Sequence, residues 1–274
     1  MASRAGRWMK KNMHIKSFKP KSFPENVDIS NLRNIKFGID PTFNRLHIGH
    51  LVPLAWLKHH LKKDITIILG TVTAQLGDPS GKDKTRPILS SMLVGSHADL
   101  IELQLRIILP EVRIVRQAPI DALELLNVSS NFTVTKLMSR DGFQKRESVG
   151  SHELMVPILQ ALDSVFLQTE LELGGEDQLF NFELTREVQK LHGQKPEACL
   201  MFPIIRGTDG QKMSKSLGNC IWLDDPNIRQ RIMSISDDVM DEWLPLFSTS
   251  DEAPDHPKER KEFLAQEICK LIGV

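Results

Sequence analysis

Long apolar runs are missing from this sequence: no stretch approaches ~18 uninterrupted apolar residues, the length that a membrane-spanning helix requires. A net charge is missing too, because 35 lysines and arginines balance 35 aspartates and glutamates. Contact with nucleic acid therefore requires a local basic patch. Cysteine is scarce, and Cys199, Cys220 and Cys269 lie outside any metal-ligand spacing. We expect buried thiols in a reducing cytoplasm, no protein-bound metal and no membrane partner.

The start of the chain lacks acidic residues: residues 1–21 carry seven basic side chains and no acidic one. They also lack the apolar centre of a secretory signal. We assign residues 1–30 to a basic N-terminal arm. Three interpretations of this arm stay open, namely a solvated arm or first helix, a contact with RNA phosphates, and an organelle-targeting segment.

Apolar runs with the length of buried strands alternate with amphipathic helical patterns along most of the chain. Strands are expected at residues 34–39, 64–69, 112–115, 171–173 and 201–205. Helices are expected at residues 47–62, 90–109 and 178–192, across most of 119–167, and from 225 to the end. Residues 70–87 are too polar and turn-rich for regular structure. This alternation predicts an α/β fold with a doubly wound parallel sheet.

Two short motifs, far apart, carry residues suited to binding a nucleotide. Residues 37–42 read Phe-Gly-Ile-Asp-Pro-Thr and residues 46–51 read Leu-His-Ile-Gly-His-Leu, a pattern of strand, tight turn and helix start. In that geometry the phosphates of a nucleotide bind to free backbone N–H groups. Residues 212–216, Lys-Met-Ser-Lys-Ser, predict a flexible basic loop. Between these motifs lie Gly-Asp-Pro-Ser-Gly-Lys at 77–82 and Gly-Gly-Glu-Asp-Gln at 174–178.

The first and last motifs resemble the HIGH and KMSKS motifs of class I aminoacyl-tRNA synthetases, and the two between them resemble those of the tyrosyl-tRNA synthetase family. The resemblance covers roughly residues 30 to 272. It implies a split Rossmann (HUP-type) catalytic domain at residues 31–225 and a short C-terminal helical region at 226–274. Within the domain, a helical insertion at about 119–170 would form a homodimer contact.

Joining a carboxylic acid to ATP needs positioning and cationic stabilisation, because charge builds on the phosphates as pyrophosphate leaves. His47 and His50 share one face at a helix start and can both point at phosphates. The resemblance gives the stabilising role to six residues: His47, His50, Lys82, Arg86, Lys212 and Lys215. It assigns ATP binding to Gly38, Asp40, Thr42, Gly49, Gly174, Asp177 and Met213, with Mg²⁺ bound through the ATP phosphates.

For the amino acid, the resemblance implies a pocket made by Lys36, Asp78, Val156, Gln160, Asp163 and Gln178. Asp78, Gln160 and Gln178 would hold the α-ammonium and carboxylate, and Asp163 matches the position that contacts the phenol hydroxyl. Two tyrosines expected in this pocket are replaced by Lys36 and Val156, and the chain contains no tyrosine at all. Lys36 could pair with Asp163 or meet an acidic or carbonyl-bearing substrate. We therefore expect poor activation of tyrosine.

The function that these features favour is ATP-dependent activation of an amino acid as an aminoacyl-adenylate, similar to a tyrosine–tRNA ligase, with transfer to tRNA. The resemblance ends before the C-terminal domain that reads the anticodon, so we expect weakened contact with tRNA. One alternative is a paralogue that activates a different amino acid and passes it to a small-molecule or protein amine. The second is a non-catalytic, synthetase-like binding protein.

Overall fold

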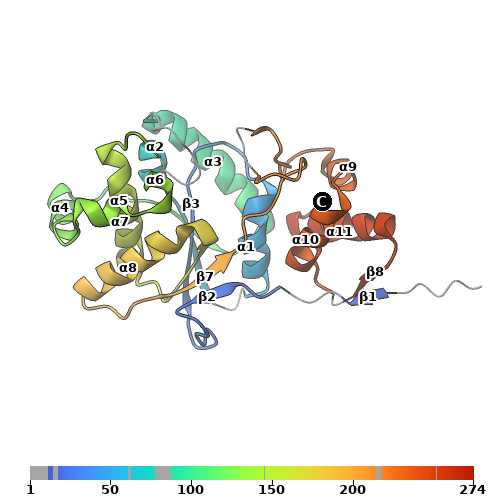
Figure 1. Ribbon diagram of the computed structural model, residues 1–274, viewed down its shortest axis with the longest axis horizontal. Helices are drawn as coiled ribbons and strands as arrows, with labels where there is room; N and C mark the ends of the chain where they lie inside the picture. The colour runs from blue at the N-terminus through green and yellow to red at the C-terminus, as the bar shows by residue number, and fades with distance from the viewer. Residues whose placement is uncertain are drawn as a thin grey trace, which may run out of the picture. The chain divides into compact units, whose positions relative to one another are not determined.

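The computed structural model describes residues 12–14, 18–60, 63–77, 88–144, 146–213, 217–250 and 252–274 (Figure 1). The chain divides into two compact units. One comprises residues up to Lys19, His47–Ala55 and Ile205–Val274, and the other comprises Pro20–Leu46 and Trp56–Ile204. Within these described ranges, no helix is long and apolar enough to cross a membrane.

The larger unit is built on a mixed sheet whose strands, in spatial order, come from both halves of the sequence. The order is β2 (Lys21–Phe23), β7 (Ala198–Phe202), β6 (Leu171–Gly175), β3 (Asn34–Ile39), β4 (Asp64–Leu69) and β5 (Arg113–Arg116). All pairs are parallel except β2 with β7. The strand order runs outward from β3 in both directions, which confirms the doubly wound α/β fold.

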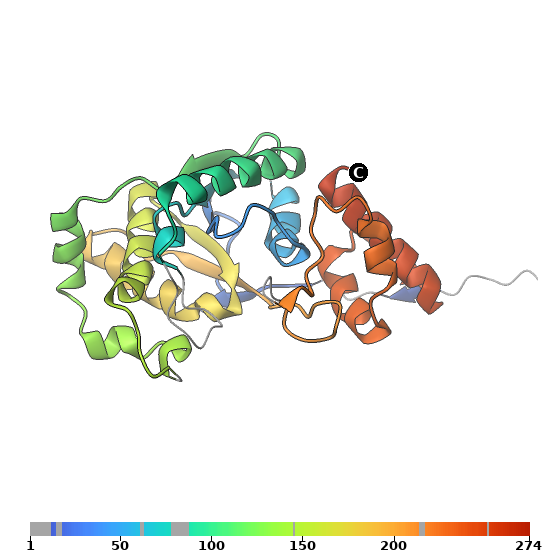
Figure 2. The ribbon, with the colours of Figure 1, turned by 90° about the horizontal axis from the view of Figure 1, so that it is seen from above.

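Helices cover both faces of this sheet (Figure 2). Since α3 follows β4 and α8 follows β6 on opposite sides of β3, right-handed crossovers place these two helices on opposite faces. The helices of the unit are α2 (Thr73–Leu76), α3 (Ser91–Ile108), α4 (Ala122–Ser129), α5 (Val134–Met138), α6 (Asp141–Gln144), α7 (Ser151–Leu167), the 3₁₀ turn η1 (Glu176–Gln178) and α8 (Leu179–Leu191).

Helices α4 to α7 occupy the stretch expected to be helical between β5 and β6. They share one apolar cluster with α8, made of Val128, Leu137, Ile158, Ala161, Leu162, Leu184 and Val188. Burial of these side chains holds α7 against α8. In this way α7 carries the predicted site residues Gln160 and Asp163 next to the sheet.

The smaller unit is mostly helical and packs around the buried side chains of Trp243 and Phe247. It contains the start of α1 (Ile48–Lys58), then α9 (Ile228–Met233), α10 (Asp237–Phe247) and α11 (Pro257–Ile272), with β1 (Asn12–His14) antiparallel to β8 (Glu252–Pro254). Residues 206–213 are attached to α10 through Arg206, whose guanidinium lies 2.6 Å from carboxylate oxygens of both Asp238 and Glu242.

Several predicted elements need correction. Helix α2 lies inside the expected loop at 70–87, and β8 interrupts the helical pattern after residue 225. The strand expected at 201–205 is β7, which ends at Phe202 because Pro203 has no N–H to continue the ladder. The strand expected at 112–115 is β5, one residue further on. Strands β1 and β2 were not predicted, since three residues carry too little periodicity.

Candidate functional site

Two histidines at the start of α1 lie against each other in the smaller unit. The ring centroids of His47 and His50 are 3.9 Å apart. The Nδ1 atom of His47 accepts from the N–H of Gly49 at 3.1 Å, and Nδ1 of His50 accepts from the N–H of His47 at 3.1 Å. A neutral ring whose Nδ1 accepts carries its proton on Nε2. Both rings therefore present an Nε2–H donor, the group that a phosphate oxygen accepts from.

Gly49 lies between the histidines for a steric reason. A Cβ at this position would lie 2.8 Å from Cε1 of His47 and 3.8 Å from Sδ of Met213. Any side chain there would displace the His47 ring. The predicted residues His47, Gly49 and Met213 thus come together around the start of α1, where the backbone N–H of Ile48 donates to the carbonyl of Ile221 at 3.0 Å.

Lys212 is the last residue of a short hairpin that the side chain of Asn219 stabilises through hydrogen bonds. The side-chain nitrogen of Asn219 donates to the carbonyl of Lys212 at 3.2 Å and to Oδ1 of Asp209 at 2.8 Å. The side chain of Lys212 is exposed, as a cation that binds an incoming phosphate must be. Lys215 lies outside the described residues, as do Asp78, Lys82 and Arg86 in the larger unit.

In the larger unit, the carboxyl ends of β3 and β4 place polar groups side by side. The hydroxyl of Thr73 donates to Oδ1 of Asp40 at 2.7 Å, and the N–H of Thr42 donates to the carbonyl of Asp40 at 2.8 Å. Gly38 is exposed although β3 is a central strand, and a Cβ there would meet only Ile68, at 3.8 Å. A ligand can therefore approach this part of the backbone closely.

Asp163, on α7, accepts from Gln117 rather than from Lys36. The Nε2 of Gln117 donates to Oδ2 of Asp163 at 2.8 Å. Burial raises the pKa of Asp163 to about 7, with smaller opposing contributions from Lys36 and from this hydrogen bond. The carboxyl group of Asp163 can therefore gain or lose a proton near neutral pH.

Lys36 is fully enclosed and its ammonium group meets three acceptors. Its Nζ lies 2.9 Å from Oε1 of Glu172, donates to the carbonyl of Gln160 at 3.2 Å, and donates to the hydroxyl of Ser164. Ser164 in turn donates to Glu172 at 3.2 Å. The proposed ion pair between Lys36 and Asp163 is therefore wrong: the partner of Lys36 comes from β6, directly opposite Lys36 in the parallel register.

A second buried glutamate, Glu197, lies beside this pair. Burial would raise the pKa of Glu172, but the attraction of Lys36 and hydrogen bonds from its neighbours bring it below the ordinary value. The pKa of Glu197 is raised well above its ordinary value, first by burial and then by the charge of Glu172. The attraction of Lys36 thus favours the ionised form of Glu172, and burial beside that charge favours the protonated form of Glu197.

Two further predicted residues of the amino-acid pocket, Gln160 and Gln178, are linked by hydrogen bonds through the side chain of Asn181. Gln160 donates through Nε2 to Oε1 of Glu172 at 2.9 Å, and its Oε1 accepts from Nδ2 of Asn181 at 2.8 Å. The same Nδ2 donates to Oε1 of Gln178 at 2.6 Å. Val156 is buried one helical turn before Gln160, and Asp177 is exposed in η1, just after β6.

Gly174 has a packing role of its own, because a Cβ there would lie 2.7 Å from Cζ of Phe182. This close approach accounts for the glycine without a ligand. The ribose-binding role that the resemblance gives to Gly174 and Asp177 stays a prediction.

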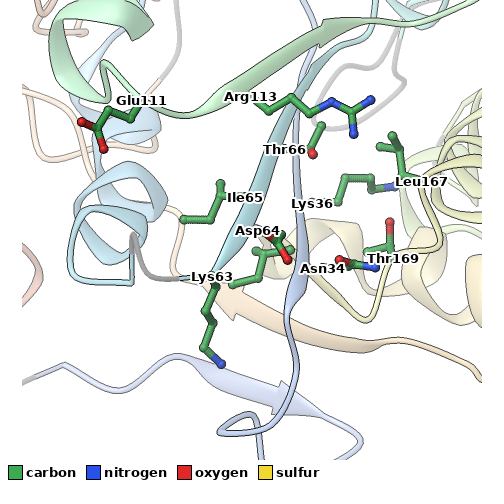
Figure 3. A pocket seen from close by; sticks show the side chains of 11 residues that line it. Asn34, Lys36, Lys63, Asp64, Ile65, Thr66, Glu111, Arg113, Leu167 and Thr169 are labelled. Carbon is green, nitrogen blue, oxygen red and sulfur yellow. The ribbon is translucent and has the colours of Figure 1, made fainter.

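A cavity of about 400 Å³ lies in the larger unit, and Lys36 is the one predicted site residue among those that line it (Figure 3). Figure 3 shows Asn34, Thr66 and Arg113, which come from the amino ends of β3, β4 and β5, around it. Asp40 and Gln117 follow the carboxyl ends of β3 and β5. Ligands of doubly wound sheets bind outside the carboxyl ends, so this cavity is not the predicted site.

Sequence reasoning missed four residues that shape the site: Thr73, Gln117, Glu172 and Asn181. Glu172 and Asn181 flank the Gly-Gly-Glu-Asp-Gln motif, and an acid in the middle of an apolar strand run is the signal that could have identified Glu172. Thr73 and Gln117 carry no such signal, because only the fold brings them to Asp40 and Asp163.

Comparison with known proteins gives a consistent result. Residues 32–270 match the family described as tRNA synthetases class I (W and Y). The chain is 38% identical over 276 residues to tyrosine–tRNA ligase 2 of Vibrio parahaemolyticus, covering 89% of this chain and 70% of that protein. It is 42% identical over 229 residues to the tyrosine–tRNA ligase of Mannheimia succiniciproducens, covering 78% of this chain and 58% of that protein.

Among solved structures, the crystal structure of a tyrosyl-tRNA synthetase complexed with L-tyrosine from Archaeoglobus fulgidus matches with a TM-score of 0.71. The match has 21% sequence identity and covers 89% of each chain, so it shows likeness of fold. The chain spans 58% to 70% of the length of the two curated relatives named above.

Proposed function

Because the chain belongs to the class I tRNA synthetase family of the tryptophan and tyrosine enzymes, we propose that it activates tyrosine with ATP and transfers the tyrosyl group to tRNA. The relatives named above are tyrosine–tRNA ligases, which disfavours both a paralogue for another amino acid and a non-catalytic binding protein. In the first step a carboxylate oxygen of tyrosine attacks the α-phosphorus of ATP, and pyrophosphate leaves.

The observation that carries the proposal for tyrosine is the arrangement of Asp163. Gln117 occupies its Oδ2, so Oδ1 is the oxygen available to accept from a phenol hydroxyl. Lys36 is held by Glu172, Ser164 and Gln160, and all three ammonium hydrogens have an acceptor. Lys36 therefore has no donor left for a substrate side chain. This removes one of the two reasons to expect poor activation of tyrosine; the other is the replacement of a tyrosine by Val156.

The residues of the smaller unit have the chemistry that the leaving pyrophosphate requires. The Nε2–H groups of His47 and His50 donate to phosphate oxygens as negative charge develops, and Lys212 adds a mobile cation. Lys82, Arg86 and Lys215 extend this set by resemblance. Gly38, Asp40, Thr42, Gly49, Gly174, Asp177 and Met213 are proposed to bind the nucleotide.

Magnesium enters this proposal through the phosphates of ATP. Among the described residues, no group of three or more His, Cys, Asp or Glu side chains could hold a metal ion. Mg²⁺ keeps several water ligands and is commonly bound through substrate phosphates. We propose that Mg²⁺ arrives with ATP, where it would neutralise phosphate charge.

We further propose that the protein is a homodimer. Leu123, Leu126 and Val134 on α4 and α5 are 64% to 66% exposed, and Phe166 at the end of α7 is 84% exposed. Large apolar side chains exposed on helices that share one buried cluster indicate an interaction surface. A self-complementary contact between two copies is the commonest way to bury such a surface.

Amino-acid-dependent exchange of pyrophosphate into ATP, measured over a panel of amino acids, tests the activation step. We expect tyrosine to give the highest kcat/KM. In the same assay, His50→Ala should lower kcat about 100-fold with little change in KM, since it removes a transition-state donor. His59→Ala, an exposed histidine just after α1, is the control and should behave as wild type. No exchange with tyrosine would contradict the proposed substrate.

A further inference from the structure

We propose that Asn181 and Glu172 are positioning residues that set which end of the Gln160 and Gln178 amides faces the substrate. This inference rests on the proposed function, in which these two glutamines hold the α-ammonium and the α-carboxylate. It concerns the direction of a hydrogen-bond chain inside the larger unit, and it assigns an indirect role to Lys36.

The hydrogen-bond chain starts at the carboxylate of Glu172, a group that can accept hydrogen bonds but not donate them. The carboxylate of Glu172 is 1% exposed and is kept ionised by Lys36, whose Nζ lies 2.9 Å away. An ionised carboxylate has no hydrogen to donate. Gln160 must therefore turn its amide nitrogen toward Glu172, where it donates at 2.9 Å. The amide oxygen of Gln160 then lies on the opposite side.

Asn181 passes this direction on to Gln178. Its Nδ2 donates to Oε1 of Gln160 at 2.8 Å and to Oε1 of Gln178 at 2.6 Å, so both of its hydrogens are used. Because the oxygen of Gln178 faces Asn181, its amide nitrogen is the end directed away from Asn181. The orientation of both glutamines thus follows from the charge of the buried pair.

The resulting orientations match the two charged groups of an amino acid. A carbonyl oxygen has two lone pairs, and the one on Gln160 that Asn181 does not use suits an α-ammonium. The amide nitrogen of Gln178 is a donor and suits an α-carboxylate. With both amides reversed, a donor would face the ammonium and an acceptor would face the carboxylate.

The hydrogen bonds of Asn181 indicate that its neighbours, and not Asn181 itself, determine the orientation of its amide group. Its side chain is 1% exposed, yet its Oδ1 has no hydrogen-bond partner among the described residues. A buried acceptor without a partner is costly. The Asn181 amide keeps this orientation because turning it over would place its oxygen against the oxygens of Gln160 and Gln178.

Asn181→Asp tests the proposal, because aspartate has nearly the same shape but accepts where asparagine donates. The KM for tyrosine in pyrophosphate exchange should rise about 10- to 100-fold, the range for a disrupted hydrogen bond to a charged group. The KM for ATP should change less than about threefold. Glu172→Gln introduces a donor at the anchor, and it is combined with Lys36→Met so that no unpaired buried charge remains. This double variant should give the same split, and it decides the question if the Asn181→Asp variant does not fold.

Calorimetric binding of three ligands separates this role from a structural one. Tyramine lacks the carboxylate and 3-(4-hydroxyphenyl)propionate lacks the ammonium. We expect the variants to lose more affinity for tyrosine than for either analogue, because each analogue lacks one group that the reversed amides repel. An equal loss for all three ligands, or an unchanged KM for tyrosine, would overturn the proposal.

Thr185→Val is the matched control on the same helix. Its hydroxyl is buried and donates to the backbone carbonyl of Asn181 at 2.8 Å, outside the amide chain. This variant should melt at a lower temperature but keep the wild-type KM for tyrosine. If wild type activates another amino acid, the proposed substrate is wrong, and the same variants are measured with that amino acid, whose α-groups are identical.

Discussion

Gln117 ties the carboxyl group of Asp163 to the backbone of the turn that follows β4. Its Nε2 donates to Asp163 at 2.8 Å, while its Oε1 accepts from the N–H groups of Val72 and Thr73 at 3.0 and 2.9 Å. The amide of Gln117 cannot rotate without losing all three bonds. The backbone N–H groups of Val72 and Thr73 therefore fix the side from which Gln117 donates to Asp163.

This arrangement predicts a pH dependence of stability. The folded-state pKa of Asp163, about 7, lies above the ordinary value of 3.8, so the folded protein binds the extra proton between these values. The contribution of Asp163 to the free energy of unfolding is thus present in acid and lost as the pH rises toward 7. Urea unfolding at several pH values should show a weaker decline for Asp163→Asn; an identical decline would contradict the assignment.

Gly49→Ala should impair catalysis with little loss of fold. The new methyl group would lie within 3 Å of the His47 ring and displace the Nε2–H donor. We expect kcat for pyrophosphate exchange to fall at least ~10-fold, since a misplaced donor loses most of its effect on the transition state. Gly95→Ala is the control: nothing lies within 4 Å of its Cβ position in α3, and alanine favours a helix there. Equal activity of both variants would refute the role of Gly49.

Lys36→Met should destabilise the protein strongly, because it leaves Glu172 ionised and buried without its cation. Loss of one partner of a buried pair costs about 3–5 kcal/mol. The double variant Lys36→Met with Glu172→Gln should recover part of this loss, since no unpaired charge remains. Chemical denaturation of wild type, both single variants and the double variant gives the coupling energy. A double variant no more stable than Lys36→Met would argue against the ion pair as the cause.

Leu126→Glu should weaken the proposed homodimer, because it places a charge among the exposed apolar side chains of α4 and α5. Light scattering at micromolar concentration should show the wild type at about twice the 31.1 kDa chain mass, and the variant at the chain mass. Met92→Glu on α3 removes a side chain that is 85% exposed, and this control should remain dimeric. A wild-type protein that scatters as a monomer would disprove the dimer.

The sequence predicted the sheet well where strands are long and apolar, as at Asn34–Ile39 and Asp64–Leu69. It could not predict β2, which depends on pairing with β7, a strand far away in the chain. His47 was identified from the chemistry of a short local pattern, whereas Gln160 was assigned only through the resemblance to the family. The partner of Lys36 was not, since the register of β3 against β6 decides that Glu172, and not Asp163, faces it.

The buried charge cluster also constrains the order in which the chain can fold. Lys36 lies on β3, whereas Glu172 and Glu197 follow only after β5 and the helices α4 to α7. A nascent chain that had reached β5 could pair three strands, but the residues that enclose Lys36 come from α7 and β6 and would still be missing. The first half of the sheet therefore has little stability before the second half arrives, and the two halves should fold as one cooperative unit.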